Sequence, residues 1–320
     1  MAGISDFIKI AKIDSCKHLS SGMRYDSFVH WAGFIIPNFQ EKLLKDPGSV
    51  DDLAFRKEVF SYINLRVGTP HDLFLLFCHA ISESVSENVK VLNGTVNVDL
   101  LSNLNNPSDF IDAIKKSCEK YQDKVTVRPY LGLDSNSEKH INLATMLLES
   151  GIFAGIELYG TAFAEKPEKF LTIFKTARKL NIESRIGSLG FRNFTDRESI
   201  LEIVQNLQPS VILNPNIVIK KDNLLIFKDG KILPEVINFL KTNNIRTEFS
   251  PAPFLSKQNS EEKTRVIREF AEKGLDFKLC SEDMLFLNKS LSEFAADLCN
   301  TGVFSQEELV EIISNTPSRA

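Results

Sequence analysis

The sequence predicts an α/β protein that folds as a (β/α)8 TIM barrel, and three observations carry this prediction. Short β-branched runs recur along the 320 residues, and each is followed by a longer segment with apolar residues at helical spacing. Such alternation requires a parallel sheet, because every crossover helix returns the chain to the same edge. The chain has no GxGxxG turn after its first strand and no P-loop, which disfavours an open nucleotide-binding sheet. We therefore expect a single barrel domain over residues 1–320.

Eight candidate strands account for the barrel. Two weaker candidates lie at 8–15 and 88–92, and six clearer ones lie at 124–131, 153–158, 181–186, 211–214, 245–249 and 275–280. Between the clearer strands, apolar residues at intervals of three and four predict helices at 107–121, 166–180, 196–206, 233–243 and 261–273.

A helical insertion, at about residues 23–74, follows the first strand. It is predicted to hold two or three extra helices, which contain Trp31, Phe34, Phe39 and Phe60. An insertion at this point lies at the C-terminal face of a barrel, where sites form, and could cover that face as a lid. Core packing is the commoner role of such aromatic side chains, and we favour it here.

The composition is that of an ordinary globular chain, with 43% hydrophobic and 25% charged residues. A net charge of -4 gives no attraction to phosphate backbones, so nucleic acid is not an expected partner. Neither a secretory signal nor a membrane-spanning run is present, and we expect a cytoplasmic protein without membrane contact. The five cysteines form no CxxC pair, which favours reduced thiols over disulfides.

Four segments carry a resemblance to the adenosine deaminase family. KIDSCKHLSSGMR at 12–24 resembles the family's K-[IV]-[DE]-L-H-x-H-L-D-G-S-L-R, FAGIELYGTA at 153–162 resembles V-x-G-x-D-L-A-G-x-E, and IRTEFSP at 245–251 resembles I-x-x-E-V-C-P. The segment 279–312 resembles the closing S-T-D-D-P-x-x-F block and the helix beyond it, and this match is the most specific. The resemblance covers nearly the whole chain. It implies an adenosine deaminase-like barrel whose relatives use zinc to remove the 6-amino group of adenosine.

The zinc ligands that the resemblance implies are mostly replaced. Cys16 stands at the first histidine of H-x-H, His18 keeps the second, Gly187 stands at the fifth-strand histidine, and Glu282 replaces the eighth-strand aspartate. Zinc needs three or four nitrogen, sulfur or carboxylate ligands to activate water. Residues 141–320 contain no histidine, so no register restores an imidazole there. We therefore expect no cofactor, and Cys16, His18 and Glu282 are weak candidates if zinc is bound.

The catalytic positions implied by the resemblance are also depleted. Gly190 replaces the glutamate that protonates the purine ring, and Asn214 replaces the sixth-strand histidine. Asp283 keeps the aspartate that orients the attacking water, so it is the one candidate catalytic residue. Loss of an acid or base alone costs roughly 10²–10⁴ in rate. We judged a joint carboxylate site of Glu282 and Asp283 unfavourable, because adjacent strand residues face opposite sides unless the strand has ended.

Ligand binding could persist without catalysis. Gly160 keeps the family glycine whose backbone touches the purine, whereas Ser20 replaces the aspartate that contacts ribose. A pocket at the barrel mouth is the default ligand site, and its possible polar lining residues are Ser188, Asn214, Tyr159 and Arg128. Capping of strand ends explains these side chains equally well. Lys12 and Asp14 are predicted to be exposed or strand-end charges.

Three functional hypotheses remain from the sequence. The leading one is a non-catalytic barrel that binds a small, purine-like ligand or a protein partner. The alternative is a divergent metal-dependent deaminase or hydrolase, acting on a purine nucleoside or base through Cys16, His18, Glu282 and Asp283. A pure scaffold role is a third possibility. The sequence leaves the oligomeric state open.

Overall fold

The computed structural model describes residues 3–34, 36, 52–187, 197–215, 219–220, 223–224, 227–228, 231–251 and 257–314. Eight parallel strands form one sheet in the order β1-β2-β3-β4-β5-β6-β11-β12. Their bounds are β1 Lys12–His18, β2 Val89–Asn97, β3 Thr126–Asp134, β4 Gly155–Tyr159, β5 Glu183–Gly187, β6 Val211–Leu213, β11 Arg246–Phe249 and β12 Phe277–Leu279.

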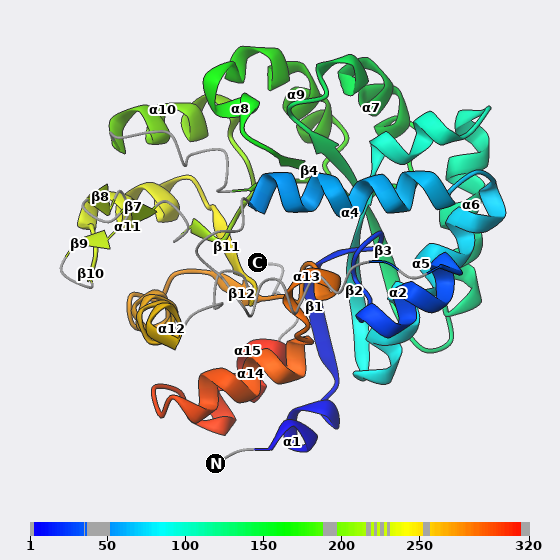
Figure 1. The fold of residues 1–320 in the computed structure, drawn as a ribbon. Coiled ribbons are helices and arrows are strands. Elements are labelled where there is room, and N and C mark those ends of the chain that lie inside the picture. The colour runs from blue at the N-terminus through cyan, green and yellow to red at the C-terminus, as the bar shows by residue number, and fades with distance from the viewer. Residues whose placement is uncertain are drawn as a thin grey trace.

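The sheet closes on itself just beyond β12. Lys17 and Glu282 form a parallel bridge, in which the Glu282 amide donates to the Cys16 carbonyl at 2.8 Å and the His18 amide donates to the Glu282 carbonyl at 3.1 Å. The predicted (β/α)8 barrel is confirmed, and Figure 1 shows its strands surrounded by helices. All eight predicted strands exist, with ends that differ by at most five residues.

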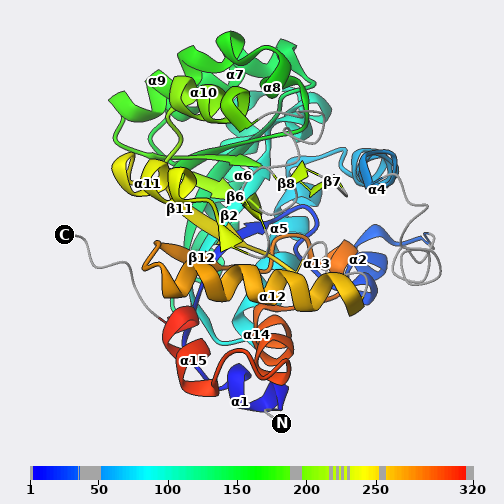
Figure 2. The same ribbon diagram turned by 90° about the vertical axis from the view of Figure 1, so that its left-hand side faces the viewer.

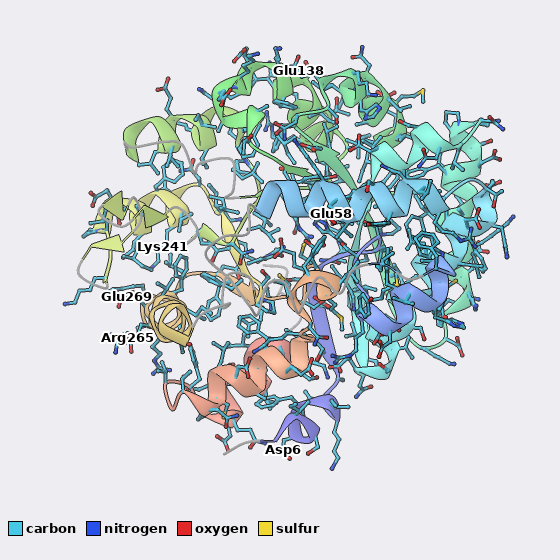
Figure 3. All side chains as sticks on the ribbon, viewed as in Figure 1. Asp6, Glu58, Glu138, Lys241, Arg265 and Glu269 are labelled. Atoms are coloured by element: carbon cyan, nitrogen blue, oxygen red, sulfur yellow. The ribbon has the colours of Figure 1, made fainter. Side chains whose placement is uncertain are left out.

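Helices follow the strands and cover the barrel. The longer ones that continue βα units are α6 Pro107–Lys120, α7 Ile141–Leu148, α9 Leu171–Lys179, α10 Arg197–Leu207, α11 Pro234–Thr242, α12 Lys257–Glu272, α14 Leu291–Asn300 and α15 Gln306–Ser314. Short helical turns lie at η1 Val98–Asn103, η2 Glu138–His140, α8 Ala162–Glu165, η3 Pro167–Phe170 and α13 Met284–Leu287. An extensive apolar core fills the layer between strands and helices. Charged side chains such as Glu138 and Lys241 lie at the periphery (Figure 3).

The insertion after β1 contains α2 Tyr25–Ala32 and α4 Asp52–Arg66, and it leads into α5 Pro70–Ser86. Trp31 is buried and Phe34 and Phe60 pack against the core, as expected for aromatic residues in this segment. Phe39 lies outside the described residues. Helix α4 passes in front of the barrel strands in Figure 1, and Figure 2 places it on the same side of the barrel as α13. The inserted helix is therefore on the side where the strands end.

Three details differ from the sequence predictions. Residues 4–8 form a helix, α1 Ile4–Ile8, so the first strand starts at Lys12 and not at Ile8. The buried Phe7 anchors this helix, and its carbonyl accepts a hydrogen bond from the Lys12 ammonium at 2.8 Å. Between β6 and α11, the structure adds two short antiparallel pairs: β7 Ile219–Lys220 with β8 Asn223–Leu224, and β9 Phe227–Lys228 with β10 Lys231–Ile232.

Lys12 and Asp14 were predicted to be exposed or strand-end charges. Lys12 does begin β1, but exposure is wrong for both, since each is only 1% exposed. Lys12 also donates to the Ile10 carbonyl at 3.0 Å. Asp14 accepts hydrogen bonds from the amide of Ser281 at 2.9 Å and from its hydroxyl at 2.5 Å. Burial is tolerated because both side chains have polar partners, which the sequence pattern does not reveal. Among the described residues, no helix is both long and apolar enough to cross a membrane.

Charged side chains fill part of the barrel interior, where aliphatic residues are usual. This barrel charge cluster consists of Tyr130, Glu183, Arg185, Arg246 and Glu248. Arg185 donates to Glu183 Oε1 at 3.0 Å, its Nε lies 3.6 Å from Glu248 Oε2, and its guanidinium carbon lies 3.9 Å from the centre of the Tyr130 ring. Arg246 Nη2 donates to Glu183 at 2.7 Å and to Glu248 at 3.0 Å. Each buried charge in the cluster therefore has an opposite charge beside it.

Candidate metal and active site

Polar side chains from β1 and β4 meet at the carboxyl ends of the barrel strands. His18 Nε2 lies 2.8 Å from Glu157 Oε1, and the Cys16 thiol donates to Glu157 Oε2 at 3.5 Å. Thr95 of β2 donates to the same oxygen at 2.7 Å. All four side chains are buried. Because side chains two apart on a strand share a face, Cys16 and His18 both reach Glu157 inside the barrel.

Asp283 completes this group, and we call Cys16, His18, Glu157 and Asp283 the mouth cluster. Asp283 follows β12 directly before α13, is fully buried, and accepts a hydrogen bond from the hydroxyl of Ser21. Its Oδ1 lies 3.4 Å from His18 Nδ1. The two nitrogens of His18 therefore face two different carboxylates.

The charges of the mouth cluster are strongly coupled. Burial opposes protonation of His18, but Asp283 and Glu157 together hold the pKa of His18 well above its usual value. Burial by itself raises the pKa of Glu157, yet the charge of His18 and its hydrogen bond lower that pKa to about 2. The pKa of the Cys16 thiol is raised, mainly by its hydrogen bond with Cys280 and also by burial. Without a metal, the cluster thus holds an imidazolium between two carboxylates, and its cysteine is a thiol.

The donor atoms of the mouth cluster suit a metal ion. Cys16, His18 and Glu157 offer one sulfur, one nitrogen and one oxygen, all within 4.8 Å of one another. This donor set is one that zinc accepts. A second group in the described part of the chain, Cys16, Glu248 and Cys280, meets the same distance criterion. The residues present therefore fit a metal ion, although the histidine-rich set of the family is absent.

Glu157 was missed as a candidate ligand in the sequence. A signal was available, because Glu157 stands where the family motif has its aspartate, between the aliphatic Ile156 and Leu158. An acid at an inward position of an otherwise apolar strand is costly unless it is paired or binds a metal.

Glu282 was predicted as a candidate metal ligand, but its carboxylate contacts residues outside the mouth cluster. Its Oε2 accepts a hydrogen bond from Asn214 Nδ2 at 3.1 Å and another from the Ser250 hydroxyl. Glu282 and Asn214 both adopt left-handed backbone conformations, with φ of 52° and 47°. Strand β12 ends at Leu279, so both Glu282 and Asp283 can be buried on the inner side of the barrel. Neither group of clustered donors in the described residues includes Glu282.

The other predicted site residues are dispersed. Ser20 is fully buried, and its hydroxyl has no hydrogen-bond partner in the described structure. Tyr159 lies at the mouth, with its ring centre 5.8 Å from that of His18. Arg128 is exposed near the amino end of β3, so the prediction that it lines the mouth is wrong. Ser188 and Gly190 lie outside the described residues.

Gly160 closes the turn after β4 in a conformation that excludes other residues. Its φ is 86°, and an added Cβ would overlap Asp134 Oδ1 and lie 2.7 Å from Asn136 Nδ2. We expect Gly160→Ala to lower the free energy of unfolding by about 1–3 kcal/mol, measured by urea denaturation. Gly302→Ala is the matched control, because Gly302 has φ of 74° but no atom within 4 Å of the added Cβ. Equal losses in the two variants would show that crowding at Gly160 contributes nothing.

The chain thus forms a closed eight-stranded barrel with buried sulfur, imidazole and carboxylate donors at its strand ends. No protein-family model matches the chain. It is 25% identical over 300 residues to a protein of Treponema pallidum (strain Nichols) provisionally named adenosine/adenine deaminase, covering 92% of this chain and 93% of that protein. The resemblance to the adenosine deaminase family is therefore confirmed over nearly the whole chain.

Solved structures support the same fold. An Arabidopsis protein called ADAL, in complex with IMP, matches with a TM-score of 0.74 at 17% identity, over 95% of this chain and 89% of that chain. An amidohydrolase from Burkholderia ambifaria with bound zinc matches with a TM-score of 0.68 at 15% identity, over 92% of this chain and 80% of that chain. At these identities the likeness shows the fold alone.

The expectation that the protein has no cofactor is corrected by these findings. A protein of the same fold carries zinc, and this chain gathers Cys16, His18 and Glu157 within 4.8 Å of one another. The later strands lack histidines, but the fourth strand supplies a carboxylate, that of Glu157. Three donors from β1 and β4 are enough to hold a catalytic metal with an open position.

Proposed function

We propose that this protein is a metal-dependent hydrolase of the deaminase type that acts on a purine base or nucleoside. One observation carries the proposal: Cys16, His18 and Glu157 present sulfur, nitrogen and oxygen donors within 4.8 Å of one another, with Asp283 beside His18. The Treponema pallidum relative, provisionally named adenosine/adenine deaminase, supports the purine substrate class. The Arabidopsis structure solved with IMP supports a purine ligand in this fold.

Each residue of the mouth cluster has a task in this proposal. Cys16, His18 and Glu157 would hold the metal, which when bound supplies the Lewis acidity that makes water a nucleophile near neutral pH. Asp283 is a buried carboxylate at the same end of the barrel, and it can take the proton from the attacking water. Ser21 donates to Asp283 and fixes the direction of that carboxylate.

Ligand contacts are proposed for residues around the mouth cluster. Gly160 offers backbone atoms where a side chain would not fit. Ser20 has a buried hydroxyl without a hydrogen-bond partner in the described residues, and such a group gains from a ligand hydroxyl or ring nitrogen. Asn214 and Ser188 are proposed as further polar contacts.

A second candidate function is binding of a purine-like ligand without turnover. Gly187 and Gly190 favour it, because they stand where the family has a metal histidine and an acidic glutamate. The loss of a general acid alone costs roughly 10²–10⁴ in rate. The comparisons with deaminases favour the enzymatic proposal over this one.

Metal analysis together with ammonia release separates the two functions. The purified protein is expected to contain one divalent metal per chain, and to release ammonia from adenine or adenosine. A chelator should abolish this activity and added zinc should restore it. His18→Ala is expected to lose both metal and activity, whereas His71→Ala, on the exposed first turn of α5, should change neither. Thermal stabilisation by adenosine without metal or ammonia release would overturn the enzymatic proposal in favour of binding alone.

A further inference from the structure

A second layer of donors lies against the mouth cluster. Cys280 follows β12, Glu248 lies on β11, and both face Cys16 of β1. The three side chains have no exposed surface. Their two sulfurs and one carboxylate oxygen lie within 4.8 Å of one another. Cys16 belongs to both donor groups, so its sulfur joins the mouth cluster to this deeper layer.

The distances in this layer are those of a site that could close on a metal ion. Four ligands at zinc bond lengths of 2.0–2.3 Å are separated by roughly 3.3–3.8 Å. The three donor atoms lie within 4.8 Å of one another, so small shifts of their side chains would bring them to these separations. Oxygen Oε2 of Glu248 is buried and has no hydrogen-bond partner in the described residues. Arg185 Nε lies 3.6 Å from this oxygen, too far for a hydrogen bond, and a bound cation would supply the close partner that the oxygen lacks.

The surrounding charges also suit a sulfur-ligated cation. Arg185 Nε lies 3.6 Å from Glu248 Oε2, and Arg246 donates to Glu248 Oε1 at 3.0 Å. A cation bound by two thiolates and carboxylates carries an excess of negative charge. Two neighbouring guanidinium groups offset that excess inside the barrel.

We propose that Cys280 and Glu248 join the ligands proposed above, so that the cation of this protein is bound through two sulfurs, those of Cys16 and Cys280. The inference rests on the proposed function and deepens it, because it names the chemical class of the metal. Each thiol gives its proton to solvent as its sulfur binds the cation. Thiolate ligands select soft or borderline ions such as zinc and cadmium over magnesium or manganese. The chain therefore has a site selective for thiophilic metals, in which Cys16 stands at the position of a histidine in the motif that the sequence resembles.

Cadmium titration of the metal-free protein tests the inference, since cadmium bound to sulfur absorbs in the near ultraviolet. The unaltered protein is expected to show this absorption, saturating at one cadmium per chain. Cys16→Ser and Cys280→Ser should each reduce it to about half, because one of the two sulfur bonds remains. Cys299→Ser is the control and should leave it unchanged, since Cys299 belongs to neither donor group.

The outcomes distinguish this inference from the proposed function. Full absorption in Cys280→Ser would overturn the inference. If His18→Ala and Cys16→Ser still lost the bound metal in that case, the proposed function would stand. Absence of both cadmium absorption and bound zinc in the unaltered protein would overturn both. A further test is X-ray absorption at the zinc edge. It is measured on the unaltered protein, so it does not require any variant to fold. Two sulfur neighbours are expected there, and one or none would refute the two-sulfur ligation.

Discussion

Replacing Arg185 by methionine is expected to lower the free energy of unfolding by about 3–5 kcal/mol. Arg185 has no exposed side-chain surface, and it pairs with Glu183 at 3.0 Å and with Glu248 at 3.6 Å. Methionine fills similar space but leaves two carboxylates, Glu183 and Glu248, sharing Arg246, so that one negative charge is uncompensated. The cost arises from this uncompensated charge, and urea denaturation followed by circular dichroism measures it.

Two further variants make this prediction specific. Arg185→Met combined with Glu248→Gln should be more stable than Arg185→Met alone, because the second change removes the unpaired charge. Arg268→Met is the surface control. Arg268 also pairs with two glutamates, Glu272 and Glu308, but in a solvent-exposed position, so its loss should cost no more than about 1 kcal/mol. If Arg185→Met and Arg268→Met were equally stable, the barrel charge cluster would have no stabilising role.

The second large effect is expected on catalysis. Asp283→Asn should lower the rate of ammonia release from a purine substrate by about 10²–10⁴, because the amide cannot accept the proton of the attacking water. Asparagine has nearly the same size, and its carbonyl oxygen can still accept the hydrogen bond from Ser21. The fold and the metal content should therefore be retained. Steady-state kinetics with metal analysis of the same sample checks both statements.

Asp297→Asn provides the matched control for this substitution. Asp297 lies on α14 and pairs with Lys289 at the surface. Its replacement should leave the rate unchanged. A rate within a factor of about ten of the unaltered protein in Asp283→Asn would remove Asp283 from the proposed chemistry. Loss of metal in that variant would instead assign Asp283 to positioning His18, whose Nδ1 lies 3.4 Å away.

Sequence patterns predicted part of the candidate site. Cys16, His18 and Asp283 were all identified as candidates, and the structure brings all three together at the mouth. Glu282 was expected with them, but it contacts Asn214 and Ser250. The reason is the left-handed backbone at Glu282, which turns the chain after β12 has ended. The position of a residue in a sequence motif does not show whether the backbone turns in this way.

The fold was determined largely by the sequence alone. Alternation of strand and helix patterns is a local property, because it depends on the spacing of apolar residues within each segment. Eight such units with short connections leave few arrangements, and the parallel barrel is one of them. For the same reason the insertion after β1 and the five helices predicted between the clearer strands could be placed before any coordinates were known.

Only the tertiary structure decided which polar residues meet inside the barrel. Glu157 is 141 residues from Cys16, yet the two lie 3.5 Å apart because closure of the sheet turns β1 and β4 toward one interior. The same closure brings Cys280 and Glu248 to Cys16 and pairs Arg185 with Glu248. From the sequence alone, a strand carboxylate that contacts water cannot be told from one that contacts an arginine or a metal ligand. Its chemistry depends on neighbours across space, which are set by strand register and burial.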